Sequence, residues 1–325
     1  MDPEEIGRRV GVFALLLVIV LGSSVAFAGG ATPEAPSVQS LDLEAYSGDG
    51  LVADHPEETG EIELAANATG EAVLIDASHG SSMDREQLAP IVSALTESGA
   101  EVRFLSERHD RRPRGGSPFN ASLRGADAFI AVGAEQGYSP SQVNGLEAFA
   151  DAGGRVLLLK EPARMQVSFF FSPHPEPASV PMPLAPLASR FGVSFGNGYL
   201  YNMQEYATNY RNVYVTPAND GPLTEGVDRL VLHESTPVTG PTTVLRTIEG
   251  TELSETRATG QYGVAVRADN VTAVGDASLF GQAYYRRGDN EVFVSNVLAF
   301  LVTGNKTPMD APAPPEPEEP PREPP

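Results

Sequence analysis

The segments Ala128-Phe-Ile-Ala-Val132, Ser139-Pro-Ser-Gln142 and Arg155-Val-Leu-Leu-Leu159 together decide the fold class of this chain. The first and third are short apolar runs, as expected for buried strands. The second predicts a helix start, because Ser is a favoured N-cap, Pro suits the first helical position and Gln completes a capping box. Gly153-Gly154 would end that helix. A strand, a helix and a strand at this spacing predict parallel neighbours in a doubly wound α/β sheet.

The same alternation extends toward the N-terminus. An apolar strand is predicted over Ala72–Ile75, ending at Asp76, and another over Glu101–Leu105. Between them, apolar residues recur at helical spacing and define one face of a helix that Gly99 would end: Leu88, Ile91, Val92 and Leu95. We therefore expect a mostly parallel sheet in the first half of the domain.

The second half is less regular and predicts a β-rich insertion. A short helix is expected over Leu184–Phe191, and a final helix is expected to start at Asp289 or Asn290. Four short apolar runs predict strands: Val213–Val215, Arg229–Leu232, Val264–Val266 and Val271–Val274. The last strand and the final helix would complete the sheet.

Composition divides the 325 residues into four parts. Residues 29–70 contain nine acids and no base, which predicts an acidic disordered linker. Residues 306–325 are rich in Pro and Glu, which is typical of a disordered polyproline II tail. The α/β domain is therefore expected over residues 71–305, and residues 1–28 form a separate segment.

Residues 1–28 resemble an export segment. Arg8 and Arg9 precede an apolar run, Val10–Leu21, and small residues end the segment at Ala28. A signal peptide cleaved after Ala28 and a transmembrane anchor both fit. Either places the domain on the extracytoplasmic side of the cell membrane, or releases it, because the Arg pair stays inside. Four N-glycosylation sequons agree with export: those of Asn67, Asn120, Asn270 and Asn305.

The amino-acid composition excludes several classes of site and partner. The chain has no Cys, so disulfides, thiolate metal sites and a Cys nucleophile are excluded. Its net charge is −21, which argues against nucleic-acid binding. The only lysines are Lys160 and Lys306, and high acid content with almost no Lys resembles the proteins of salt-loving archaea. We expect a halophilic surface that this charge keeps solvated.

Three polar loops follow predicted strands, where ligands bind in open parallel sheets. Asp76, Ser78 and His79 form the first, and they suit acid–base or nucleophilic chemistry. The alternative is structural, with these side chains bonding the local backbone. The second loop holds the basic residues Arg108, Arg111 and Arg112, whose guanidinium groups would bind carboxylate or phosphate or balance nearby acids.

The third loop contains Asp276, which would face Asp76 across the sheet edge. Two such carboxylates with a histidine could hold a divalent cation. No ligand spacing of a known type appears, however, so neither a metal nor a cofactor is predicted.

Four segments of the domain resemble the family called domain of unknown function 4350: Val73–Gly80; Leu123–Val132 with Tyr138-Ser-Pro; Leu146–Leu159; and Val274–Phe280 with Asp289-Asn290 and Val294–Leu298. That family is similar to the class I glutamine amidotransferase-like fold, a flavodoxin-like sheet, and to domains of intraflagellar transport and gliding-motility transporter proteins. The amidotransferases have a nucleophilic Cys on the turn that corresponds here to Lys160-Glu-Pro162. The resemblance therefore implies the fold without the glutaminase activity.

The resemblance also implies a setting. Members of the family tend to be membrane-linked and encoded beside a MoxR-type ATPase, so cell-envelope proteins are the expected partners. We therefore expect a non-catalytic domain that binds a ligand or partner, or acts as a scaffold, at the cell surface. The alternative is a hydrolase that uses Asp76, Ser78 and His79.

Overall fold

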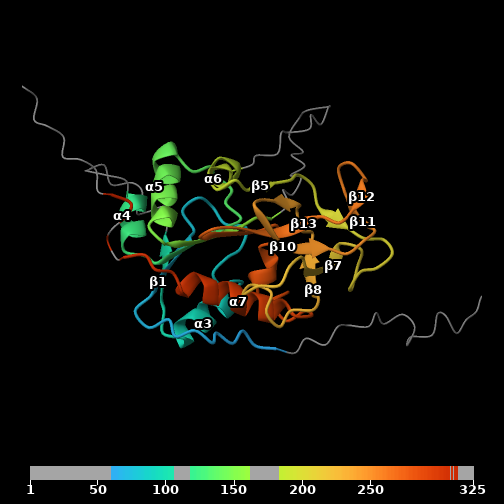
Figure 1. Cartoon of the computed structure of the whole chain (residues 1–325), viewed down its shortest axis with the longest axis horizontal. Helices are drawn as coiled ribbons and strands as arrows, with labels where there is room; N and C mark the ends of the chain where they lie inside the picture. The colour runs from blue at the N-terminus through green and yellow to red at the C-terminus, as the bar shows by residue number, and fades with distance from the viewer. Residues whose placement is uncertain (1–59, 106–117, 162–182, 308, 310, 314–325) are drawn as a thin grey trace, which may run out of the picture. The chain divides into compact units, whose positions relative to one another are not determined.

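Nine strands form one mixed sheet at the centre of the described part of the chain. The structure is a computed structural model, and it describes residues 60–105, 118–161, 183–307, 309 and 311–313 (Figure 1). Half of the sheet is parallel, in the order β2-β1-β3-β4-β14. These strands are β1 (Ala72–Asp76), β2 (Glu101–Leu105), β3 (Ala128–Val132), β4 (Arg155–Leu159) and β14 (Val271–Val274). All five were predicted from the sequence.

The other half of the sheet is antiparallel and continues from β14. Its order is β13-β10-β7-β8, with β7 (Asn212–Pro217), β8 (Leu230–His233), β10 (Thr242–Thr247) and β13 (Gly263–Ala268). Two small sheets lie beside it, made of β5 (Ser194–Phe195) with β9 (Val238–Thr239), and of β6 (Leu200–Tyr201) with β11 (Thr251–Leu253) and β12 (Thr259–Gly260). The expected β-rich insertion therefore lies between β4 and β14, but β10 and the short strands were not predicted.

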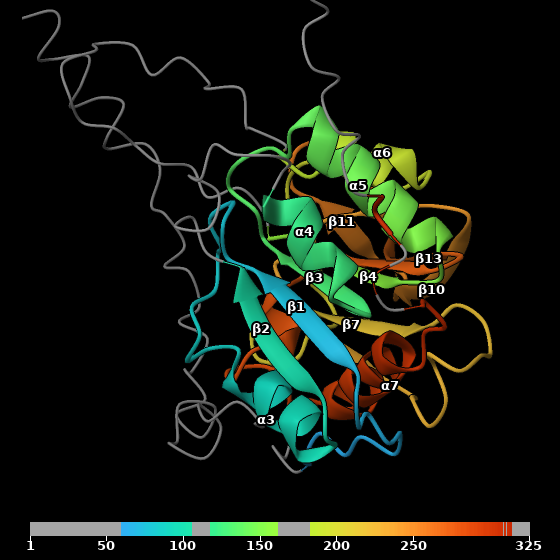
Figure 2. The ribbon, with the colours of Figure 1, turned by 90° about the vertical axis from the view of Figure 1, so that its left-hand side faces the viewer.

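Helices cover both faces of the sheet (Figure 2). The first face carries α3 (Ala89–Glu97) and α7 (Asn290–Val302), and the second carries α4 (Pro118–Arg124), α5 (Pro140–Asp151) and α6 (Ala185–Arg190). Successive side chains of a strand point to opposite faces. Two hydrophobic clusters result, one on each face, and every residue of β1 and β3 is buried.

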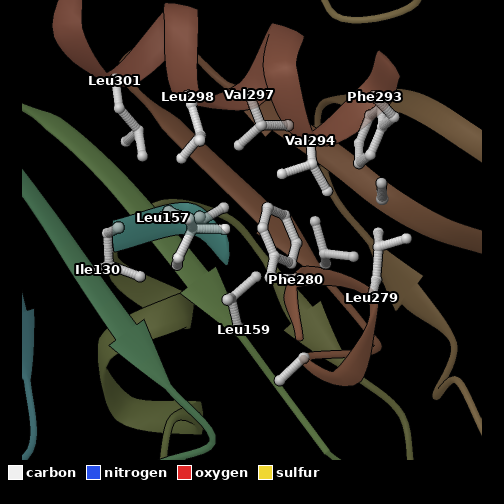
Figure 3. Packing of buried hydrophobic residues seen from close by; sticks show 14 of the residues in the cluster. Ile130, Leu157, Leu159, Leu279, Phe280, Phe293, Val294, Val297, Leu298 and Leu301 are labelled. Atoms are coloured by element: carbon white, nitrogen blue, oxygen red, sulfur yellow. The ribbon is translucent and has the colours of Figure 1, made fainter. Parts of the chain in front are cut away.

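Helix α7 packs an apolar face against the parallel strands (Figure 3). Phe293, Val294, Val297, Leu298 and Leu301 are completely buried, and they lie over side chains of β3, β4 and the 3₁₀ helix η3 (Ser278–Phe280). Each such side chain stabilises the fold by about 1.5–3 kcal/mol. The packing fixes the ends of β4 and β14, where the candidate loops begin.

The folded part extends beyond both predicted boundaries. Ile62 and Leu64, placed by composition in the linker 29–70, pack against the core, and Ala68 is completely buried. This segment packs against the core because its apolar residues recur at every second position, as they do in a strand, although the segment is acidic. At the other end, Lys306 is buried and its Nζ donates to the Arg124 carbonyl at 3.0 Å. The start of the predicted tail 306–325 is therefore also packed.

The predicted export segment, residues 1–28, lies outside the described residues. Within the part of the chain that the structure describes, no helix has the length and apolarity needed to cross a membrane.

Candidate functional site

The loops after β1 and β3 form a single unit at the carboxyl ends of the parallel strands. The carbonyl oxygen of His79 accepts hydrogen bonds from the backbone N–H groups of Glu135 (3.0 Å) and Gln136 (2.8 Å). Gly133 has φ +50°, and a Cβ atom there would lie 1.9 Å from the Ser82 hydroxyl oxygen. Only glycine allows this approach without strain. The two loops therefore have a fixed relative position.

Asp76 lies at the centre of a buried polar cluster. Its Oδ1 accepts the backbone N–H of Ser78 at 2.8 Å and the Ser78 hydroxyl at 2.7 Å. Its Oδ2 accepts the Tyr138 hydroxyl at 2.6 Å and lies 2.7 Å from His79 Nδ1. The four residues are between 2% and 8% exposed. The cluster thus joins the β1 loop to Tyr138, which lies just before α5.

The contacts of the His79 ring require both of its nitrogens to carry hydrogen. Nδ1 faces the Asp76 carboxylate, which only accepts. Nε2 lies 3.2 Å from Gln142 Oε1, and this oxygen also accepts the Ser139 backbone N–H at 2.7 Å. Because that N–H can only donate, the atom facing His79 is the amide oxygen. These partners are the ones that suit an imidazolium cation paired with Asp76. The ring also stacks on Tyr138, with 4.1 Å between ring centroids.

The electrostatics of the cluster follow from this pair. Burial by itself would raise the pKa of Asp76, but the hydrogen bond and charge of His79, with the hydroxyls of Ser78 and Tyr138, lower it below its ordinary value. Burial, followed by the charge and hydrogen bond of Asp76, raises the pKa of Tyr138 well above its ordinary value. The carboxylate is thus ionised and the phenol is neutral at pH 7.

This geometry differs from that of a nucleophilic triad. In a triad, histidine uses one ring nitrogen for the carboxylate and the other for the hydroxyl. Here Ser78 Oγ lies 3.1 Å from Nδ1, the same nitrogen that faces Asp76. The Ser78 hydroxyl donates to Asp76, and Nε2 is occupied by Gln142. The three residues were predicted to lie in one loop, and the structure brings their side chains together. Asp76 bonds the local backbone N–H of Ser78, as the structural alternative expects, whereas Ser78 Oγ and the His79 ring contact side chains instead.

Tyr138 and Gln142 were not predicted to belong to this cluster. Gln142 was predicted only as part of a capping box with Ser139, and that box is present at the start of α5. Its Oε1 also holds His79, a contact between residues 63 positions apart. The adjacent Tyr138-Ser-Pro motif was the available signal, since the loop after β3 ends at the same sheet edge as the loop after β1.

Asp276 does not face Asp76, so the predicted pair of carboxylates is wrong. Strands β3 and β4 separate β1 from β14 in the sheet. At about 4.8 Å per strand, that separation is roughly 14 Å. Among the described residues there is no group of three or more His, Asp or Glu that could hold a metal ion. The other predicted ligand residues, Arg108, Arg111 and Arg112, lie outside the described residues.

Asp276 instead bonds to the outer backbone edge of β8, the last strand of the sheet. Its Oδ2 accepts the backbone N–H of His233 at 2.6 Å. Asn290 accepts the Val231 N–H at 3.0 Å and donates to the Val231 carbonyl at 2.8 Å. Asp289, expected as a helix cap, accepts the N–H groups of Asp228 and Arg229, both at 2.8 Å. These side chains replace the missing neighbouring strand, which protects the edge from pairing with another chain.

The turn after β4 begins with a charged residue of each sign, Lys160 and Glu161. Lys160 stands there, buried, with its Nζ donating to the Gly196 carbonyl at 2.9 Å. Burial lowers its pKa, against the opposing effect of Glu255. Glu161 follows and accepts the backbone N–H of Ser278 at 2.7 Å. Both side chains thus connect the turn to neighbouring segments.

Comparison with known proteins places this fold in a family. No curated protein matches the chain. Among solved structures, the mmIFT52 N-terminal domain is similar with a TM-score of 0.56 and 12% identity, over 72% of this chain and 98% of that one. A protein described as thua-like, from Parabacteroides merdae, has a TM-score of 0.41 and 10% identity, over 72% of this chain and 90% of its own. The first shows a shared fold. The model of the domain of unknown function DUF4350 matches residues 92–298, more than half of the sequence, and the chain therefore belongs to the DUF4350 family.

Proposed function

We propose that this chain is a non-catalytic binding or scaffold domain held on the extracytoplasmic side of the cell membrane. The observation that carries the proposal is the pairing of His79 with both Asp76 and Gln142. It leaves no ring nitrogen to act as a base for Ser78. A buried polar cluster with its groups satisfied makes the surrounding structure rigid, and here it fixes the two loops of the sheet edge.

The exposed surface of these loops is the proposed binding face. Ser82, Glu135 and Gln136 are exposed residues of the loops after β1 and β3. In open α/β sheets, ligands bind outside the carboxyl ends of the strands, at the point where the strand order reverses. That point lies between β1 and β3 here. Envelope proteins encoded beside a MoxR-type ATPase are the partners we propose from the family resemblance.

We also propose that the parallel half has the flavodoxin-like, class I glutamine amidotransferase-like fold. Its strand order, β2-β1-β3-β4-β14, matches the 2-1-3-4-5 order of flavodoxin-like sheets.

The low Lys content supports adaptation to high salt. Because high salt screens exposed ion pairs, other contacts must provide the affinity for a partner.

Site-specific photo-crosslinking in native membranes tests the binding face. A crosslinking residue at Gln136 should capture a discrete partner, whereas one at exposed Asp220, in the antiparallel half, should not. Equal yields from both positions would contradict the proposal. Ester or glycan hydrolysis by the purified chain that Ser78→Ala abolishes would support the hydrolase instead.

A further inference from the structure

The four sequons differ in how the fold presents their asparagine amides. N-linked glycosylation requires an accessible side-chain nitrogen, Nδ2, with a hydroxyl residue two positions later. Asn67 and Asn305 are exposed, whereas Asn120 and Asn270 are partly buried. The side-chain hydrogen bonds separate the four sites further.

The side-chain amide of Asn67 is accessible. Its Oδ1 accepts the backbone N–H of Thr69 at 3.0 Å and the Thr69 hydroxyl at 2.7 Å, so the two ends of the sequon bind each other. No described residue accepts a hydrogen bond from its Nδ2, which keeps both hydrogens for another molecule. Ala68 between them is completely buried, and its backbone N–H donates to Ser98 at 3.0 Å. The turn is therefore held in place while Asn67 and Thr69 point outward.

The side-chain amide of Asn120 is blocked by the contact between α4 and α5. Its Nδ2 donates to the Ser141 carbonyl at 3.3 Å, and a Cβ atom on Gly145 would lie 2.2 Å from its Oδ1. The hydroxyl of its sequon, on Ser122, donates to the Pro118 carbonyl at 3.1 Å. Residues two apart on a helix do not face each other, so this hydroxyl cannot reach the asparagine amide.

The side-chain amide of Asn270 is held by hydrogen bonds beside the sheet. Its Oδ1 accepts from Arg155 at 2.5 Å, and its Nδ2 donates to the Ala150 carbonyl at 2.8 Å. Thr272 of the same sequon is completely buried in β14, between two paired strands. Asn305 is exposed, but its Oδ1 lies against Gly153, where a Cβ atom would be only 2.3 Å away.

We propose that Asn67 is an N-glycosylated residue of the folded domain and that Asn120 and Asn270 are not modified. The acceptor is the Asn67 amide, and the donor is a saccharide carried on a lipid phosphate. A bond forms between Nδ2 and the anomeric carbon of the saccharide, and the bond from that carbon to the phosphate oxygen breaks. The oxygen keeps the electron pair, and a base of the transferase takes one amide proton. This inference rests on the extracytoplasmic position proposed above.

A glycan at Asn67 leaves the proposed binding face uncovered. Asn67 precedes β1 at the amino end of that strand, whereas Asp76 and the binding loops lie at the carboxyl end. Five residues of strand separate the two ends by roughly 16 Å. Glycosylation and partner binding at the strand ends are therefore compatible.

Mass spectrometry of the full chain, purified from its own cells, tests this site. The peptide containing Asn67 should carry the glycan, and the peptides containing Asn120 and Asn270 should be unmodified. Asn67→Gln and Thr69→Ala should each remove the glycan. The matched control Ser122→Ala, which destroys the Asn120 sequon, should leave the glycan mass unchanged.

Two results would overturn the glycosylation proposal. One is an unmodified Asn67 in protein that has been exported to the extracytoplasmic side, and the other is a glycan on Asn120 or Asn270. The first leaves the binding proposal intact, because the crosslink from Gln136 does not depend on a glycan. Conversely, a glycan on Asn67 without a crosslink from Gln136 supports the site and contradicts the binding face.

Discussion

Asp76 and Asp276 both lie at the carboxyl ends of parallel strands, and both are buried, at 2% and 0% exposure. Their partners differ. Asp76 faces the His79 cation, and its pKa is lowered although burial would raise it. Asp276 is held by the backbone N–H of His233 and the Ser278 hydroxyl, and burial raises its pKa to about 6 against the effect of these donors. The pKa values of the two carboxyl groups therefore shift in opposite directions, because His79 and the hydroxyl donors outweigh burial at Asp76, whereas burial outweighs the donors at Asp276.

The largest expected effect of a single substitution is that of His79→Ala. It leaves Asp76 buried and ionised without its cation, which costs about 3–5 kcal/mol. Urea unfolding would measure the loss. The double variant Asp76→Ala/His79→Ala should lose less than the sum of the single variants, because the two side chains interact directly. Additive losses would show that the pair is not coupled.

Asn290→Ala should have the next largest effect. It removes the side chain that satisfies Val231 N–H and C=O and also donates to the Tyr284 carbonyl at 2.8 Å. Leaving such buried groups unpaired costs about 2–4 kcal/mol in total. The uncovered β8 should also promote aggregation, measurable by light scattering. The control Asn296→Ala, on the same helix, also removes hydrogen bonds to carbonyls but should leave β8 covered.

The pH dependence of stability should differ at the two carboxylates. The folded pKa of Asp276, about 6, is above its ordinary value of 3.8. The folded state therefore binds the extra proton between these values, and lowering the pH from 7 to 4 should stabilise the chain through Asp276 by about 1–3 kcal/mol. Below pH 4, protonation of Asp76 should destabilise it, because the folded pKa of Asp76 is lowered. Asp276→Asn should remove the gain between pH 6 and 4, as measured by thermal unfolding; an unchanged profile would contradict this assignment.

The smallest expected effect is that of Ser139→Ala. Ser139 caps α5 and shares the capping box with Gln142, which holds His79. Loss of an N-cap costs about 0.5–2 kcal/mol. The control Ser189→Ala, at an exposed site on α6, should cost less in the same unfolding experiment. Equal losses would mean that the capping box does not support the cluster.

The parallel half of the fold was predictable because its signals are local. Ala128–Val132 and Arg155–Leu159 are buried on both faces, so they are continuous apolar runs. In contrast, β10 begins with two Thr residues and has one partly solvent-facing side, and the pairs in the small sheets are only two or three residues long. Their positions depend on pairing with distant strands.

The candidate site was predictable in part for the same reason. Asp76, Ser78 and His79 are neighbours in the sequence, so their mutual contact follows from one turn. The contacts of Tyr138 and Gln142 with that turn arise only when β3 pairs with β1. Asp276 was misplaced because the sequence does not reveal that β3 and β4 separate its strand from β1.

The central claim is that His79 is a cation with both ring nitrogens bonded, and nitrogen-15 NMR of the histidine rings tests it most directly. At pH 7, the account predicts that His79 Nδ1 and Nε2 both carry hydrogen and that Asp76→Asn alters both signals. A neutral His79 ring with one unprotonated nitrogen would contradict the account, because the ring would then not be the cation that pairs with Asp76.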